Sequence, residues 1–505
     1  MKRTHRDPRT TVRAKIAERT AGGSLQSTHG RGQNPCRQLP HFSWLAVFSA
    51  LTCLAGGLAQ AASAPAEQHW PHWRGPLANG LAPNGDPPSR WSETEKVKWK
   101  FKLPSEGLAT PVIWGDRIFL VSAIATGKRP EGAPAQPAPQ PQTQQQPQAK
   151  PEGQRRGGRF GGGGGGRGGG GAPNEAYQFV VLCLDRPTGK LLWQKVAREE
   201  VPHQGHQPSH RFASASPVTD GEQLYVSFGS WGVYCYDFNG NLKWERDFGK
   251  MRTPFGEGTS PVVHDGKLII NWDHDGDDFI AALDTKTGQT IWKTDRTERT
   301  TWVTPAVIPT SQGTQIVVPA PSKTRGYDLA TGKVLWECGG QASGNVVPVP
   351  VVGHGFVFAM SGHQGNSVQA IRYDRTGDLT GTDGVAWSLS RNAPHVPSPL
   401  LYDDLIYFLS NNNPILSCYE AKTGQPHYEA QRLEGMRGGY PSPVGAAGRV
   451  YFVGPDGTAL VIKKGPQFEV LATNKLEDQF QSSPAIVGKE LFLRGFKQLY
   501  CIAEK

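Results

Sequence analysis

Residues 260–292 read SPVVHDGKLIINWDHDGDDFIAALDTKTGQTIW, and this stretch contains both halves of a unit that recurs along the chain. The first half is Ser-Pro-Val, then a turn, then an apolar strand. The second half is Asp284, Gly288 and Trp292. In that half the acidic side chain opens a tight turn, the glycine supplies a positive φ, and the following strand delivers an indole.

The first half of the unit occurs eight times. From the second copy onward, successive prolines are separated by 41 to 49 residues. A period of about 44 residues with four short strands per unit is typical of β-propellers rather than helical solenoids. The low charged fraction of 19%, with 62 Gly and 41 Pro, also argues against helical bundles. The copies begin at Thr110, Ser216, Ser260, Thr304, Val349, Ser398, Ser442 and Ser483.

The second half keeps an acidic residue, a glycine and an aromatic residue at offsets of four and eight. One copy is a residue shorter, and another reads Glu420, Gly424 and Tyr428. An indole that recurs once per unit is best interpreted as a wedge between neighbouring sheets. The repeat residues are Asp185, Gly189, Trp193, Asp237, Gly240, Trp244, Asp284, Gly288, Trp292, Asp328, Gly332 and Trp336.

The last copy ends before any acidic residue-Gly-Trp element, at LYCIA near the C-terminus. The missing outer strand is present upstream of the first copy, as VKWKFKLP at 97–104 with Trp99. A strand from the N-terminal side would fasten the ring and remove its free edges. We therefore predict an all-β, eight-bladed propeller of four-stranded blades over residues 97–505, with seven blades as the alternative. The seventh blade is degenerate, since IKKGPQFEV at 462–470 lacks the acidic residue and the indole.

The acidic residue-Gly-Trp signature resembles the tryptophan-docking repeat of quinoprotein alcohol dehydrogenase-like propellers. That group contains enzymes that use pyrroloquinoline quinone (PQQ) and also BamB, the propeller of the outer-membrane β-barrel assembly machinery. The segment WPHWRGPLANG at 70–80 is similar to the opening of secreted PQQ-binding-like β-propeller repeat proteins. This resemblance is specific for the fold and says little about activity.

The resemblance implies a calcium ion held by Glu, Asn and Asp, an Asp base and a pair of adjacent cysteines if the chain were a PQQ enzyme. The chain has no adjacent cysteines, and no residue can be carried over as a calcium ligand or base. We therefore expect no catalytic residue and no cofactor, leave cofactor-binding residues unassigned, and keep PQQ with calcium as the alternative. The expected function is a non-catalytic protein-interaction scaffold, similar to BamB. The alternatives are a PQQ- or metal-dependent oxidoreductase and a surface-polysaccharide binder.

The most acidic stretch is 273–278, where Asp273, Asp275 and Asp277 alternate as carboxylates do in some calcium loops. An EF-hand needs Gly at its sixth position and Glu at its twelfth, but Asp278 and Asp284 stand there. We expect a solvated hairpin, with these three carboxylates as weak metal candidates.

A second polar stretch is VPHQGHQPSHRF at 201–212. Its two prolines favour a loop on one face of the propeller over a helix that could present a zinc site. Other polar side chains are expected on the same face. The residues of this group are His203, His206, His210, His363, Asn366, Asn411, Asn412 and Asn413.

The net charge of +10 is concentrated in two segments. Residues 1–61 contribute +7 and residues 124–176 contribute +4, so the remaining chain is close to neutral and offers no groove for nucleic acid. Residues 1–61 have a long basic start, an apolar core and the small-residue end Ala59-Gln60-Ala61, as a cleaved secretory signal does. We therefore expect a bacterial protein of the periplasm or cell envelope. It would be a monomer without a membrane span after cleavage, and its partners would be envelope proteins.

Two further segments lie outside the repeats. Residues 62–96 form a lead segment before the propeller. Residues 124–176 are rich first in Pro and Gln, then in Gly and Arg, and cannot bury enough apolar surface to become ordered. Because this insert falls between two strands of the first blade, we expect it to loop out without breaking the sheet.

Overall fold

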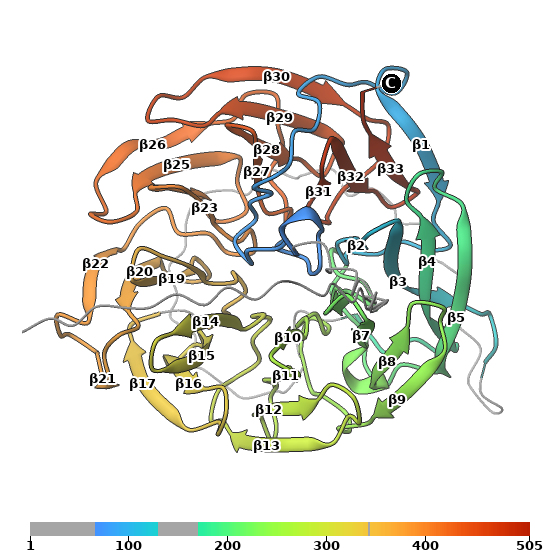
Figure 1. The fold of residues 1–505 in the computed structure, drawn as a ribbon, viewed down its shortest axis with the longest axis horizontal. Helices are drawn as coiled ribbons and strands as arrows, with labels where there is room; N and C mark the ends of the chain where they lie inside the picture. The colour runs from blue at the N-terminus through green and yellow to red at the C-terminus, as the bar shows by residue number, and fades with distance from the viewer. Residues whose placement is uncertain (1–65, 130–169, 342–343, 505) are drawn as a thin grey trace, which may run out of the picture. The chain divides into compact units, whose positions relative to one another are not determined.

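The computed structural model describes residues 66–129, 170–341 and 344–504. They form eight sheets arranged as the blades of a propeller, with two single-turn 3-10 segments, η1 (Ala66–Gln68) and η2 (Gly229–Trp231) (Figure 1). The predicted all-β fold with eight blades is confirmed. Among the described residues, no helix is long and apolar enough to cross a membrane.

Each of the first four blades is a meander that runs from the propeller axis to its rim. Blade 1 contains β2 (Val112–Trp114), β3 (Arg117–Ala125), β4 (Tyr177–Asp185) and β5 (Leu191–Glu200). Blade 2 contains β6 (Val218–Thr219), β7 (Gln223–Ser227), β8 (Val233–Asp237) and β9 (Leu242–Arg246). Blade 3 contains β10 (Val262–His264), β11 (Lys267–Trp272), β12 (Phe279–Asp284) and β13 (Thr290–Asp295). Blade 4 contains β14 (Ala306–Thr310), β15 (Gly313–Val318), β16 (Lys323–Asp328) and β17 (Val334–Gly339).

The remaining blades follow the same order, with one exception at the ring closure. Blade 5 contains β18 (Val351–Gly353), β19 (Phe356–Ser361), β20 (Ser367–Arg372) and β22 (Val385–Leu389). Blade 6 contains β23 (Leu400–Tyr402), β24 (Leu405–Leu409), β25 (Ile415–Glu420) and β26 (Pro426–Arg432). Blade 7 contains β27 (Val444–Ala446), β28 (Arg449–Val453), β29 (Thr458–Lys463) and β30 (Val470–Lys475). Blade 8 contains β31 (Ala485–Val487), β32 (Glu490–Arg494), β33 (Gln498–Ile502) and, as its outer strand, β1 (Val97–Lys102).

The ring is closed by the strand that the sequence predicted. β1 pairs antiparallel with β33, with Phe101 opposite Leu499 and Trp99 opposite Cys501. In blade 1, β3 continues to Ala125 and pairs with β4 up to Tyr177, so the predicted insert begins inside a strand. The predicted signal at 1–61 and residues 130–169 of the insert lie outside the described residues.

Neighbouring blades are joined by a repeated contact between an indole and a turn. The indole Nε1 of one blade donates to the carbonyl oxygen of the residue after the acidic position of the next blade, at 2.8–3.0 Å. Trp244 donates to Thr285 in this way, and Trp99 of the closing strand donates to Arg186. The other pairs are Trp193 with Phe238, Trp292 with Leu329, and Trp387 with Ala421.

The turn glycine is required by this contact for two reasons. Gly288 has φ +69°, which favours glycine, and a Cβ there would lie 2.7 Å from atoms of the Trp244 ring. The carboxylate of Asp284 accepts the backbone N–H of Thr287 and so holds the turn. Equivalent glycine–indole contacts occur at Gly189, Gly240, Gly332 and Gly424.

Three blade junctions depart from this pattern. Between blades 6 and 7, Tyr428 stands at the indole position and its ring packs against Phe468. Trp336 is fully buried between blades 4 and 5, but its Nε1 donates to Gln315 of its own blade at 2.9 Å. The reason is that blade 5 has a longer connection instead of the acidic residue-Gly turn, and β21 (Gly377–Asp378) of that connection pairs parallel with β17. In blade 7, Ala472 stands where other blades have an aromatic residue, and Trp91 of the lead segment packs into the same core cluster.

The inner strands are joined by the Ser/Thr-Pro residues. The backbone N–H of Ser216 donates to the hydroxyl of Ser260, and the N–H of Ser260 donates to that of Thr304. Six such bonds, at 2.9–3.3 Å, connect the first residue of one copy to the hydroxyl of the next. Val349 of blade 5 is the copy without a hydroxyl, and it still donates its N–H to Ser398.

The lead segment crosses one end of the propeller axis, where its blue trace lies over the centre of the ring in Figure 1. Its backbone forms hydrogen bonds with three blades. Trp70 bonds Ile113 of blade 1, Gly80 and Ala82 bond Gly445 of blade 7, and Asp86 bonds Gly488 of blade 8. Arg74 is fully buried and donates to the carbonyl oxygens of Asn79, Pro399 and Pro443. These contacts make the segment a plug across that end.

The glycine–indole contact can be tested with two substitutions in blade 3. Gly288→Ala places a methyl group against the Trp244 ring and strains a positive φ, so we expect a loss of about 2–4 kcal/mol in the free energy of unfolding. Gly266→Ala is the matched control, because its φ is +68° and its nearest neighbour would be 4.0 Å away. That variant should lose only about 1 kcal/mol. Urea unfolding measures both, and equal losses would show that the indole does not require the glycine.

Candidate functional site

The connections between blades converge on a cavity of about 270 Å³ at the propeller axis. This volume is close to the lower end of small-ligand pockets, about 300 Å³, and far above the ~10–15 Å³ that one water needs. The antiparallel order of each blade puts the interblade connections at the end of the axis opposite the turns that hold the plug. The cavity is therefore a well with the plug below it.

The wall of the well is built mainly by two positions of the repeat. Because the chain is extended before each inner strand, the first residue of a copy and the residue two positions before it face the same way. The residues two positions earlier line the cavity in all eight blades: Leu108, Ser214, Gly258, Trp302, Val347, Val396, Tyr440 and Gln481. Those at the first position that also line it are Thr110, Ser216, Ser260, Thr304, Ser442 and Ser483.

The aromatic residues of the wall are held by hydrogen bonds. Trp73 of the plug donates from Nε1 to Thr304 Oγ1 at 3.2 Å, and Trp302 donates to the Gly256 carbonyl at 2.7 Å. The hydroxyls of Tyr440 and Ser209 are 2.8 Å apart, so the loop before blade 2 reaches residues of blade 7 across the mouth of the well. The remaining wall residues are Gln207, His210, Phe255, Asn345, His363 and His395.

Two histidines of the well, His210 and His395, have lowered pKa values. Burial is the main cause that lowers the pKa of His210 to about 3, with His206 adding repulsion. Burial, with repulsion from His363, lowers the pKa of His395 to about 4. The rings of His363 and His395 are 4.6 Å apart, and Asn412 Nδ2 donates to His395 Nδ1 at 3.2 Å. His395 therefore carries its proton on Nε2.

The polar loop residues named from the sequence have different places in this arrangement. His210 and His363 line the cavity, whereas His203 bonds the Met251 carbonyl and His206 bonds the Gln207 carbonyl. His395 also lines the cavity and was not singled out from the sequence. The asparagines hold the connection that carries His395 and Val396. The side chains of Asn366 and Asn412 accept the backbone N–H groups of Ala393 and Val396. Asn411 forms an isolated β-bridge with Pro394, and the Asn413 N–H donates to the Ser410 carbonyl.

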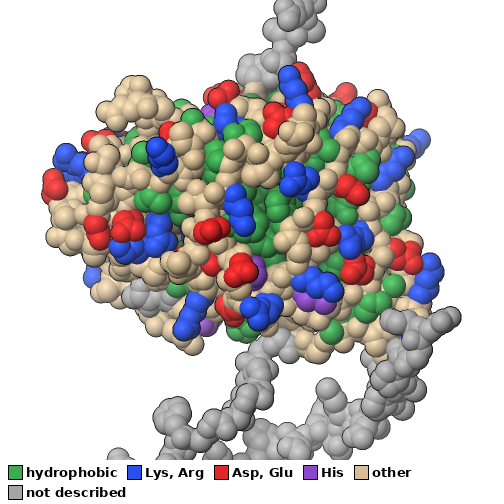
Figure 2. Space-filling view, turned by 90° about the horizontal axis from the view of Figure 1, so that it is seen from below, with side chains coloured by type: hydrophobic (Ala, Val, Ile, Leu, Met, Phe, Trp, Pro, Cys, Tyr) green, Lys and Arg blue, Asp and Glu red, His purple; other side chains and the backbone are tan. Residues whose placement is uncertain are grey.

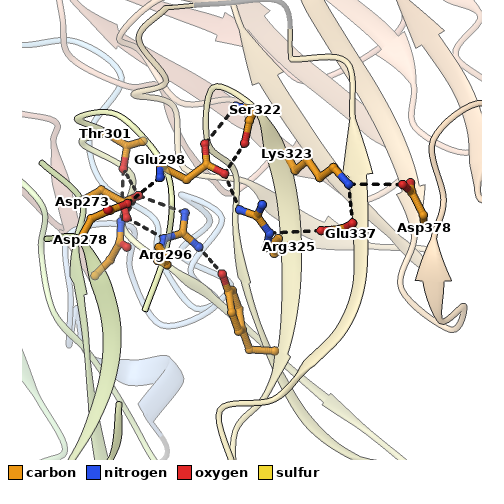
Figure 3. A network of polar contacts seen from close by, with 12 residues as sticks. Asp273, Asp278, Arg296, Glu298, Thr301, Ser322, Lys323, Arg325, Glu337 and Asp378 are labelled. Atoms are coloured by element: carbon orange, nitrogen blue, oxygen red, sulfur yellow. Dashed lines mark hydrogen bonds and ion pairs between the residues drawn. The ribbon is translucent and has the colours of Figure 1, made fainter. Parts of the chain in front are cut away.

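The acidic stretch lies apart from the cavity, in a polar network between blades 3 and 4 (Figure 3). Asp273 is buried, and both of its oxygens are bonded by Arg296, at 2.6 and 3.1 Å. Asp275 accepts from Thr300, and Asp277 is exposed. Among the described residues, no three His, Cys, Asp or Glu side chains are grouped closely enough to hold a metal ion.

The same network continues to blade 5. Glu298 accepts from Ser322 and pairs with Arg325, which also pairs with Glu337. Lys323 then joins Glu337 to Asp378 of β21, as the dashed lines in Figure 3 show. This network fixes the 296–304 connection, which carries Trp302, because Thr301 donates to Asp273 at 2.7 Å.

The wall of the well does not fit PQQ with calcium. None of the described residues that line it is Asp, Glu, Lys or Arg. Calcium takes about six to eight oxygen ligands, several of them carboxylate oxygens, and the carboxylates of the quinone would need cations or many donors. The wall also offers no carboxylate that could act as the base of an alcohol oxidation.

The sequence analysis did not identify Trp73, Phe255, Trp302, Tyr440 or Gln481 as site residues. Three of them stand two positions before a Ser/Thr-Pro pair, so aligning the copies and reading that column would have found them. Trp73 belongs to no repeat, and Phe255 lies outside that column. Only the folded arrangement brings these two to the axis.

Comparison with known proteins gives the following similarities. The family model described as "Outer membrane protein assembly factor BamB" matches residues 178–429. Among solved structures, a europium-containing methanol dehydrogenase has TM-score 0.56 at 10% identity, covering 86% of this chain and 90% of its own. The quinohemoprotein alcohol dehydrogenase from Comamonas testosteroni has TM-score 0.55 at 11% identity, covering 88% and 82%. BamB from Moraxella catarrhalis has TM-score 0.47 at 12% identity, covering 64% and 93%. No curated protein matches the chain.

The lowered pKa of His210 makes the stability of the propeller depend on pH. His210 has a lower pKa when folded, about 3, than in the unfolded chain, about 6.5, so the unfolded state binds more protons between these values. Stability should therefore fall as pH decreases from 6.5. His210→Gln should reduce the loss at pH 5 by about 1–2 kcal/mol. Urea unfolding at pH 7 and pH 5 tests this, with His264→Gln in blade 3 as control, and an unchanged loss in His210→Gln would contradict it.

The charge-free wall predicts the response to the alternative cofactor. PQQ with calcium should leave the melting temperature of the protein unchanged, because a ligand stabilises only if it binds the folded state. Differential scanning fluorimetry, with dye reduction by alcohols and aldoses measured in parallel, checks this. A cofactor-dependent rise in melting temperature together with dye reduction would show that the chain is a quinoprotein enzyme.

Proposed function

The chain is a PQQ-like β-propeller, and from this premise we propose that it is an exported, non-catalytic scaffold that binds other proteins in the cell envelope. The observation that carries the proposal is the match of residues 178–429, from blade 1 to blade 6, to the family model described as an outer-membrane assembly factor. The predicted secretory signal at 1–61 supports export.

The chemistry of the well supports a non-catalytic role. An oxidoreductase that acts on alcohols needs a base and a bound electron acceptor at the same place. The wall provides hydroxyls, amides, indoles and imidazoles, and the buried carboxylate of Asp273 in blade 3 is already paired with Arg296. The dehydrogenases similar in structure share the fold of this chain at 10–11% identity, which says nothing of their activity here.

The outer surface is suited to protein contacts. In Figure 2 acidic and basic side chains alternate over the visible side, with hydrophobic side chains between them. Many of the charges are paired, such as Arg391 with Glu429 and Lys422 with Asp404. Aliphatic side chains that are 44–49% exposed occur on the outer strands of five blades, and one from each blade is Leu192, Leu242, Ile291, Val334 and Val470.

These five positions allow a direct test in cells. A photo-crosslinking amino acid is placed at each position in turn, and envelope fractions are compared with and without irradiation. A scaffold should give a light-dependent adduct of defined mass from neighbouring blades and none from blades on the other side, because one partner covers only part of the rim. The non-irradiated samples are the control. Absence of any specific adduct at all five positions would contradict a role that depends on the rim.

A further inference from the structure

Part of the wall of the well consists of serine hydroxyls at the first position of the repeat. The oxygens of Ser216, Ser260 and Ser483 each accept a backbone N–H from the preceding blade. A hydroxyl has one proton to donate besides its acceptor positions. Accepting these bonds leaves the O–H of each serine able to donate, and all three residues line the cavity.

Aromatic rings held in place by hydrogen bonds also line the well. Trp302 is fixed through its bond to Gly256, Trp73 through its bond to Thr304, and Tyr440 through Ser209. Because these hydrogen bonds hold the rings, a bound molecule can pack against them with little cost of immobilising side chains.

The polar groups between the rings are neutral and some remain available. Nδ1 of His210 is buried and makes no hydrogen bond in the described part of the chain. Gln207 and Gln481 add amide groups, and His395 carries a donor on Nε2 because Asn412 occupies its Nδ1. A buried polar atom left without a partner is costly, so this wall favours a ligand with many hydrogen-bonding groups.

These properties together select a class of ligand. A charged ligand would be buried without a countercharge. A purely apolar ligand would leave the hydroxyls, amides and His210 unpaired. We propose that the axial well binds a neutral mono- or disaccharide, whose C–H faces pack on the aromatic rings while its hydroxyls bond the polar wall. This goes beyond the scaffold function, because it requires no protein partner.

The test is isothermal titration calorimetry of the purified protein with D-glucose, D-galactose, D-mannose, N-acetyl-D-glucosamine and maltose. D-glucuronate and D-glucosamine are the charged counterparts. At least one neutral sugar should bind, and a charged counterpart of the same ring should bind at least about tenfold more weakly, since its charge would be buried unpaired.

Two variants locate the binding. His210→Ala and Trp302→Phe should each weaken binding of that sugar about tenfold, because each removes a group of the wall. His264→Ala, in blade 3 and outside the lining of the well, should leave the dissociation constant unchanged. Circular dichroism and melting temperature show that each variant is folded, and Trp302→Phe keeps the test valid if His210→Ala does not fold.

Three results would overturn the proposal. They are no heat of binding with any of the neutral sugars, equal binding of neutral and charged sugars, or unchanged binding in folded variants of His210 and Trp302. All three are measured on the isolated protein. They are therefore independent of whether crosslinking on the rim finds an envelope partner.

Discussion

The contact between an indole and the turn glycine of the next blade is the interaction on which the rest of the molecule depends. It combines a hydrogen bond, such as that from Trp244 to the Thr285 carbonyl, with a close approach that only a glycine permits at Gly288. A ring closes only if each blade meets the next at nearly the same angle. Trp99 makes the same bond to Arg186 that the internal blades make, so the closing junction is equivalent to the others. Because these contacts fix the rim, the Ser/Thr-Pro residues of neighbouring blades lie close together at the axis. There the backbone N–H of one blade donates to the hydroxyl of the next.

The junctions that lack this contact show how much it matters. Between blades 4 and 5 the acidic residue-Gly turn is missing, and β21 adds a strand beside β17 while Trp336 bonds Gln315. Between blades 7 and 8 the indole is missing, and Trp91 comes from outside the repeat to pack in the same cluster as Ala472. Arg494 further joins blade 8 to blade 1 through the carbonyl oxygens of Ala109 and Val121. At these two junctions the weak copy of the repeat is thus compensated by a segment that is not itself a repeat.

This distinction also explains what could be predicted from the sequence. The blades, their number and the closing strand follow from local patterns that recur, so the spacing of the prolines and of Trp99 was sufficient. The plug and β21 were not predictable, because their contacts, such as Arg74 with Pro399 and Pro443, join residues hundreds of positions apart without any repeated pattern. The alternating carboxylates were ambiguous for a similar reason. Their spacing does not show that the guanidinium of Arg296, more than twenty positions later, bonds both carboxylate oxygens of Asp273.

The cavity combines both kinds of information. In the connection before each inner strand, one position holds the ring together, and the position two residues earlier faces the cavity. The Ser/Thr before each proline bonds the next blade, so changing it disturbs the ring. The residue two positions earlier faces the same axis without making that bond, and it varies from Gly258 to Trp302. Charges are kept between the blades, as in the Arg296–Asp273 pair, where partners compensate their burial. In a propeller built in this way, substitutions at the eight positions two residues before the repeat can change which ligand the well binds. The ring that shapes the well stays the same.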